Sequence, residues 1–128
     1  MQGKLRLRLL LRPGFKSTNI GLTDHFSPPF DELDNCNNLY NVSIDQVGRV
    51  AKKIKLELGR WYGIDLEWDN SKRECQVVVD GQHVAVVPQH RSGGMLSYLR
   101  LRSMAHDGDD AGILIERVAA TVDWPSSR

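Results

Sequence analysis

The sequence of 128 residues lacks a long hydrophobic run, a large excess of charge of either sign and a cysteine framework. Hydrophobic side chains make up 41% and charged ones 26%, which is typical of a globular domain. A formal net charge of +1 excludes a strong overall attraction to nucleic acid or to an anionic membrane, and no segment reaches the length of a transmembrane helix. Cys36 and Cys75 are too few for a disulfide framework, so we expect free thiols, with a single bridge as the alternative.

The first residues, MQGKLRLRLLLRPG, also lack the uninterrupted apolar stretch of a signal peptide. Arg6, Arg8 and Arg12 interrupt it and leave only residues 9–11 unbroken. We therefore expect either a cytosolic protein or, in our preferred interpretation, a part of a longer extracellular or periplasmic polypeptide. The length predicts one domain over residues 1–128.

Alternating side chains, which are typical of half-buried strands, dominate the sequence. In residues 4–12 one side of the alternation is leucine and the other is basic, and in residues 17–25 Gly21 marks a close approach or a bulge. Residues 44–58 fit either helix or strand spacing, and we predict a turn over 45–49 followed by a strand. Further strands are predicted over 39–44, 95–103 and 112–122, between loops at 26–39, 88–94 and 104–111.

The clearest pattern is a meander over residues 59–87. It contains predicted strands at 60–68, 74–79 and 82–87, and Asp80-Gly81 predicts a type I′ hairpin between the last two. In total the chain shows about eight or nine strand signals at intervals of about eight to twelve residues and no dependable helix. This spacing favours an antiparallel β-sandwich or barrel.

The Gly-x-Trp that opens this meander, the charged turn after it and the valine-rich strand that ends in Asp-Gly resemble the concanavalin A-like, laminin-G-like lectin–glucanase superfamily. The segments that carry the resemblance are residues 61–80, YLRLRS at 98–103 and GILIE at 112–116. Over residues 3–122 the chain is also similar to jelly-roll accessory modules of bacterial sialidase-like glycosidases. The resemblance implies an all-β, antiparallel jelly-roll sandwich. Such domains usually have additional earlier strands, so it also implies a truncated version in which the strand over residues 5–11 lies near an edge.

Asp65, Glu67 and Asp69 alternate along one strand, so their carboxylates share a face. Retaining glycosidases need two carboxylates a few ångströms apart, which makes these residues weak catalytic candidates. Their order departs from the Glu-x-Asp-x-x-Glu pattern of jelly-roll glucanases. We favour a solvated face whose acids pair with Arg100, Arg102 or Lys72 across strands, and we do not expect enzymatic activity from this chain alone.

Two aromatic and two basic residues are the candidate ligand-binding groups: Trp61, Tyr98, Arg100 and Arg102. An exposed ring can stack on a pyranose, and arginines can bind carboxylated or sulfated sugars, together with the basic row of residues 4–12. Core packing and a solvated strand face are the alternatives for these residues. The acidic loop containing Asp107, Asp109 and Asp110 offers oxygen ligands for Ca²⁺, although an acidic surface turn is the simpler interpretation.

These patterns predict a non-catalytic accessory or recognition module with carbohydrate as its expected ligand. It would be attached to other domains of a larger secreted protein, such as a sialidase-like glycosidase. A jelly-roll glycoside hydrolase and a purely structural or protein-interaction module remain the alternatives. No cofactor is expected apart from the Ca²⁺ hypothesis.

Overall fold

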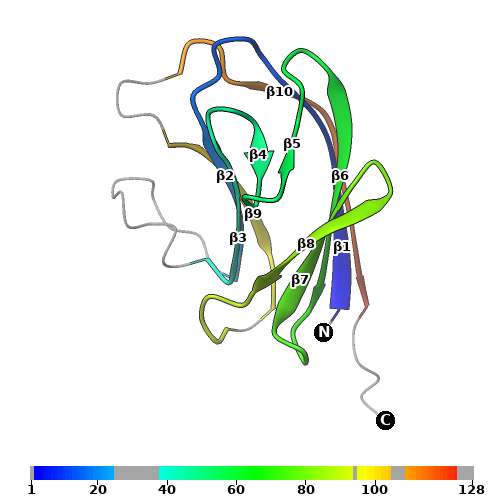
Figure 1. The fold of residues 1–128 in the computed structure, drawn as a ribbon. Coiled ribbons are helices and arrows are strands. Elements are labelled where there is room, and N and C mark those ends of the chain that lie inside the picture. The colour runs from blue at the N-terminus through cyan, green and yellow to red at the C-terminus, as the bar shows by residue number, and fades with distance from the viewer. Residues whose placement is uncertain (1, 25–37, 94, 105–108, 124–128) are drawn as a thin grey trace.

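The computed structural model describes residues 2–24, 38–93, 95–104 and 109–123. Their strands form two five-stranded antiparallel sheets that face each other as a sandwich (Figure 1). Sheet A has the order β10-β1-β6-β7-β8 and sheet B the order β5-β4-β3-β2-β9. The strands are β1 (Gln2–Leu11), β2 (Thr18–Thr23), β3 (Tyr40–Ile44), β4 (Arg49–Val50), β5 (Ile54–Lys55), β6 (Trp61–Asp69), β7 (Glu74–Val79), β8 (Gln82–Pro88), β9 (Tyr98–Ser103) and β10 (Ile113–Asp123). The predicted all-β sandwich is confirmed.

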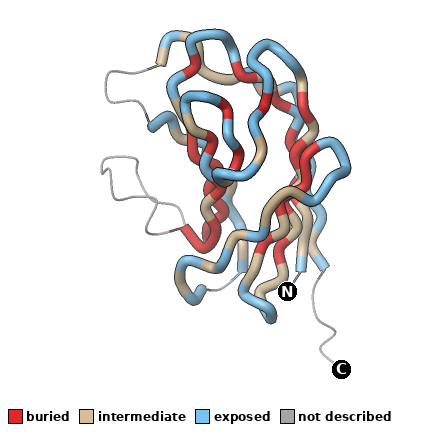
Figure 2. Tube along the Cα trace, in the orientation of Figure 1, coloured by how far each residue is buried: buried red, intermediate tan, exposed pale blue. Residues whose placement is uncertain are grey.

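The core lies between the two sheets because their strands alternate apolar and polar side chains. Burial follows this alternation in β1, β3 and β6, as Figure 2 shows. Each buried leucine removed from water contributes roughly 2 kcal/mol before conformational entropy is subtracted. The core side chains of these strands are Leu5, Leu7, Leu9 and Leu11 from β1, Tyr40, Val42 and Ile44 from β3, and Tyr62, Ile64, Leu66 and Trp68 from β6.

The meander predicted from residues 59–87 is present as β6, β7 and β8. Its second turn has positive φ at both central residues, 47° at Asp80 and 84° at Gly81, as a type I′ hairpin requires. The Asp80 carboxylate also accepts a hydrogen bond of 2.8 Å from the backbone N–H of Gly63. The turn residues therefore fix both the hairpin and its contact with β6.

The prediction of one strand after the turn at 45–49 is wrong. The chain instead forms two short strands, β4 and β5, separated by a turn over 51–53. Ala51 and Lys52 have φ of 50° and 62° in this turn, and this left-handed conformation ends the extended backbone. Alternation from Ile54 onwards therefore did not indicate a continuous strand.

The strand over residues 5–11 lies near an edge of its sheet, as expected, but it is not the edge itself, because β1 pairs with the edge strand β10 on one side and with β6 on the other. One further expectation about strand position is corrected. The strand predicted from residue 95 begins at Tyr98, and Met95 lies before it with 54% of its surface exposed. All secondary-structure elements of the described ranges are strands. These ranges contain no helix that is long and apolar enough to cross a membrane.

Candidate functional site

The outer face of sheet B is built by the register of its three longest strands. Asn19 of β2 lies between Ser43 of β3 and Arg102 of β9. Two residues further along β2, Gly21 lies between Asn41 of β3 and Arg100 of β9. Directly opposed residues of antiparallel strands share a face, and the apolar residues of β2 occupy the core side. We name this outer surface the Asn–Arg face and define it by residues Asn19, Asn38, Asn41, Ser43, Tyr98, Arg100 and Arg102.

Three asparagine side chains form a cluster at the centre of the Asn–Arg face. The Oδ1 of Asn41 accepts hydrogen bonds of 2.9 Å from the Nδ2 of Asn19 and from the Nδ2 of Asn38. Asn38 lies directly over Gly21, since a Cβ added to this glycine would be 2.1 Å from the Asn38 Nδ2. The prediction that Gly21 marks a close approach is confirmed, and only glycine leaves room for the amide.

The cluster contains one acceptor that its own residues leave unused. Asn38 is 1% exposed, and its Oδ1 has no hydrogen-bond partner within the part of the chain that the structure describes. A buried acceptor without a donor costs about 1–3 kcal/mol, so such atoms are uncommon in folded proteins. Because the atom is closed off from solvent, the donor that would satisfy it is an enclosed water molecule.

Two arginines and a tyrosine flank the cluster on the β9 side. Tyr98, which pairs with Thr23, is 46% exposed, whereas Arg100 and Arg102 are half-buried. Alternation along β9 directs all three side chains to the Asn–Arg face. On the β3 side Asn41 and Ser43 also line a hollow of about 490 Å³, whose other polar lining residues are Lys52, Gln89 and His90.

The predicted ligand-binding set is therefore only partly brought together. Tyr98, Arg100 and Arg102 share the Asn–Arg face, but Trp61 lies on β6 in sheet A. The guanidinium of Arg8 lies over the Trp61 ring, 5.5 Å from its centroid. The basic row of β1 is also on sheet A, so it does not combine with the β9 arginines as the sequence suggested.

The carboxylate ladder of β6 lies on the outer face of sheet A, where β1 supplies its partners. Arg6 donates to Asp65 from Nε over 2.9 Å and from Nη2 over 3.1 Å, and Lys4 lies 3.4 Å from the same carboxylate. These contacts, led by the Arg6 hydrogen bond, lower the pKa of Asp65. The acids therefore pair with β1 rather than with the predicted Arg100, Arg102 or Lys72.

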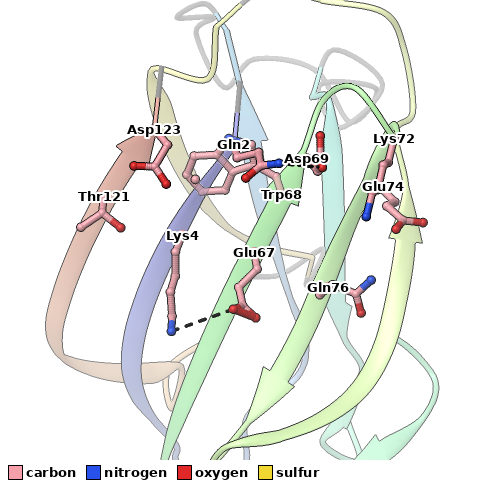
Figure 3. A pocket seen from close by; sticks show the side chains of 11 residues that line it. Gln2, Lys4, Glu67, Trp68, Asp69, Lys72, Glu74, Gln76, Thr121 and Asp123 are labelled. Carbon is pink, nitrogen blue, oxygen red and sulfur yellow. Dashed lines mark hydrogen bonds and ion pairs between the residues drawn. The ribbon is translucent and has the colours of Figure 1, made fainter. Parts of the chain in front are cut away.

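Glu67 and Asp69 line a hollow of about 450 Å³ at the end of sheet A where β1 begins (Figure 3). Lys4 lies 4.0 Å from Glu67, and Asp69 accepts hydrogen bonds from Ser71 that lower its pKa. The acid/base residue of a glycosidase needs a raised pKa. The pKa shifts of Asp65 and Asp69 have the opposite direction.

The Ca²⁺ hypothesis concerned Asp107, Asp109 and Asp110, of which Asp107 lies outside the described residues. The Asp109 carboxylate accepts hydrogen bonds of 2.8–3.1 Å from the backbone N–H groups of Lys16, Ala111 and Gly112. These bonds lower its pKa. No group of three or more potential metal ligands occurs in the described ranges. The geometry fits a carboxylate that fixes a surface turn.

Cys75 is a buried free thiol in the core, so the alternative of a single disulfide does not hold for it. Burial raises the pKa of the Cys75 thiol to about 12. Cys36 lies outside the described residues.

Sequence reasoning missed the three asparagines of the cluster. The available signal was the alternation of β2, which places Asn19 on the side opposite Ile20 and Leu22. Polar residues at such positions are ordinarily solvated, and only the strand register shows that Asn41 and Asn38 meet over Gly21.

No protein-family model and no curated protein sequence matches the chain. Among solved structures, a sialidase is similar with a TM-score of 0.67 and 17% identity over 94% of this chain. Trypanosoma rangeli sialidase has a TM-score of 0.59 and 17% identity over 93% of it. A double mutant of congerin II has a TM-score of 0.58 and 13% identity, also over 93%.

The chain spans 13% and 20% of the two sialidase chains but 90% of the congerin II chain. At these identities the similarity establishes the fold alone. The two five-stranded sheets of this chain therefore form a concanavalin A-like, galectin-like β-sandwich, similar to one segment of the sialidases and to nearly all of congerin II.

Proposed function

We propose that the chain is a non-catalytic carbohydrate-recognition module and that the Asn–Arg face is its binding site. The observation that supports this most directly is the grouping of the exposed Tyr98 ring with Arg100 and Arg102 beside the asparagine cluster on one face. Sugar hydroxyls both donate and accept hydrogen bonds, so they suit the polar groups of this face. The exposed ring of Tyr98 offers an apolar surface for stacking beside these polar groups.

The charge of the Asn–Arg face favours an acidic sugar. Arg100 and Arg102 occupy alternate positions of β9, so both guanidinium groups belong to one face. A guanidinium binds a carboxylate or a sulfate through two parallel hydrogen bonds, which a neutral sugar cannot provide. The matched T. rangeli sialidase forms a complex with 2,3-difluorosialic acid, which is a carboxylated sugar. We therefore assign carboxylated or sulfated glycans as the ligand class.

The module would belong to a larger secreted protein. Its fold matches only a limited segment of each sialidase chain, which is the arrangement expected of an accessory domain. In such a protein the sandwich would hold the polypeptide at a glycan surface while another domain acts. The sandwich itself needs no acid/base pair for this role.

The test is isothermal titration calorimetry of the 128-residue chain with sialyllactose and, separately, with lactose. The carboxylated sugar should bind more tightly than the neutral one. Arg100→Gln and Arg102→Gln should each weaken sialyllactose binding by about tenfold, since a charge-assisted hydrogen bond contributes about 1.5–3 kcal/mol. Arg12→Gln is the matched control, because this exposed arginine follows β1 and lies outside the Asn–Arg face.

Asn41→Ala should reduce binding of any glycan that reaches the amide cluster. An unchanged affinity in all three site variants would place the ligand elsewhere. Absence of binding across acidic and neutral glycans would contradict the proposal and leave a structural or protein-interaction module as the better interpretation.

A further inference from the structure

β10 forms an edge of sheet A among the described strands, and its second half is a regular strand. Arg117–Asp123 pairs residue for residue with β1, whereas a bulge at Glu116 interrupts the register before it. All of its residues are exposed except Val122, which is half-buried, and Val118 is 48% exposed. The backbone groups on its outer edge are therefore accessible to another strand.

Soluble proteins usually protect such an edge with charged side chains, proline, a bulge or a very short strand. In β10 the bulge at Glu116 lies before the segment Arg117–Asp123, and the charged residues of the segment stand only at its two ends. Ala119 and Ala120 at its centre have the shortest side chains after glycine, so a second backbone can approach them closely. The middle of this edge, residues 118–122, is therefore open to strand addition.

The sequence of this segment is complementary to itself. In antiparallel pairing about a two-fold axis perpendicular to the sheet, one residue faces its own copy and the others pair reciprocally. With Ala120 at the axis, Val118 faces Val122 of the second copy, and Arg117 faces Asp123 of the second copy. Apolar residues then meet on the core side and opposite charges meet on the outer side.

The charges around β10 favour this register. Arg117 lies opposite Arg8 in the β1 ladder, so a like charge is already beside it. Arg8 itself donates from Nε to Glu116 over 2.7 Å. Asp123 of the second copy would bring an opposite charge to Arg117, and the symmetry repeats this pair on the other side of the axis.

We propose that two copies of this chain associate through β10 with Ala120 at the two-fold axis. Sheet A becomes one continuous ten-stranded sheet, and both Asn–Arg faces lie on the same side of the dimer, opposite the outer face of sheet A. The pairing involves only seven residues of each strand. We therefore expect a weak, reversible dimer whose population rises with protein concentration. It does not depend on the proposed carbohydrate binding.

Sedimentation equilibrium of the 128-residue chain, up to about 1 mM, tests the association. The wild type should reach twice the mass of one chain. Arg117→Asp and Asp123→Arg should each reduce the association constant at least tenfold, because like charges then face each other. The double variant restores opposite charges and should restore the wild-type constant. Arg12→Asp is the matched control, since it reverses an exposed arginine outside β10.

Cysteine cross-linking tests the register separately. In a Cys36→Ser background, Ala120→Cys should form a disulfide-linked dimer on mild oxidation, because opposed Cα atoms lie about 4.5–5.5 Å apart. Ala119→Cys alone should cross-link much less, whereas a mixture of Ala119→Cys and Thr121→Cys chains should form a heterodimer. A monomeric wild type, or a dimer that neither charge reversal weakens, would overturn the proposal. Equal cross-linking at positions 119 and 120 would overturn this register.

Discussion

Replacement of Gly21 by alanine should disrupt the asparagine cluster and lower the free energy of unfolding by an amount that can be worked out from the structure. The new Cβ would lie 2.1 Å from Nδ2, 2.8 Å from Cγ and 3.2 Å from Oδ1 of Asn38. All three distances are shorter than an ordinary van der Waals contact. The Asn38 side chain must therefore move, and its hydrogen bond to Asn41 breaks.

The magnitude follows from three contributions. Loss of a hydrogen bond between buried groups lowers the free energy of unfolding by about 1–3 kcal/mol. The shifts needed to make room for the extra methyl group lower it by about 1–3 kcal/mol more. Alanine regains about 0.5–1 kcal/mol, because it lowers the entropy of the unfolded chain and favours an extended backbone. We take about 2 kcal/mol as the net destabilisation, toward the lower end of these ranges because Asn19 still satisfies the Asn41 acceptor.

Urea unfolding followed by tryptophan fluorescence measures this difference. At an m-value of about 1.5 kcal/mol/M, a loss of about 2 kcal/mol should lower the urea midpoint by about 1.3 M without a change in slope. The melting temperature should fall by about 7 °C for a chain of this length. Asn38→Gly in the same background removes the side chain that clashes, so the double variant should be more stable than the sum of the single changes predicts.

A wild-type midpoint in Gly21→Ala would refute the reasoning, since it would mean that Asn38 does not lie over this glycine. Strict additivity in the double variant would refute it as well. In that case the loss of stability would come from the strand and not from the amide cluster.

Three other predictions concern the frame around the site. Asp65→Asn should cost about 1 kcal/mol at neutral pH, a modest value because its partner Arg6 is largely exposed. The pKa of Asp65 is lowered by folding, so this contribution is present above its unfolded pKa of about 4 and is lost as pH falls through the folded value. Urea titrations of both proteins should therefore converge in acid, and a gap that widens there would contradict the ion pair. Gly81→Ala should cost about 1–2 kcal/mol, because φ of 84° is unfavourable for alanine; an unchanged melting temperature would count against the turn. In a Cys36→Ser background, the Cys75 thiol should not react with a thiol reagent at pH 8 until urea unfolds the chain, because burial raises its pKa to about 12. Fast labelling of the native protein would disprove its burial.

The sequence predicted the fold well wherever one strand alone determines side-chain orientation. Leu5, Leu7, Leu9 and Leu11 face the core as their alternation indicated, and Asp80-Gly81 makes the predicted turn. These features depend on the period of the strand and on the left-handed backbone of a tight turn. Both are local properties of the chain.

The errors arose where a neighbouring strand decides the outcome. Alternation placed Asp65 on a solvated face, but it could not show that β1 rather than β9 supplies the opposing charges. Trp61 and Tyr98 were grouped as aromatic residues, although the topology places them on different sheets. The asparagine cluster depends on register across β2 and β3, which one sequence does not contain.

The position of β1 has a consequence for how the polypeptide reaches its native state. Its partner β10 comes from the other end of the described chain, so that Leu5 is paired with Ala120. During synthesis β1 therefore leaves the ribosome long before one of its two neighbours exists. Sheet A must remain incomplete until the last strand emerges, and ladders between such distant segments form slowly, in about milliseconds to seconds. A nascent chain that stops before β10 would expose the leucine-rich first strand along a whole open edge, where a chaperone or another unfinished copy would meet it first.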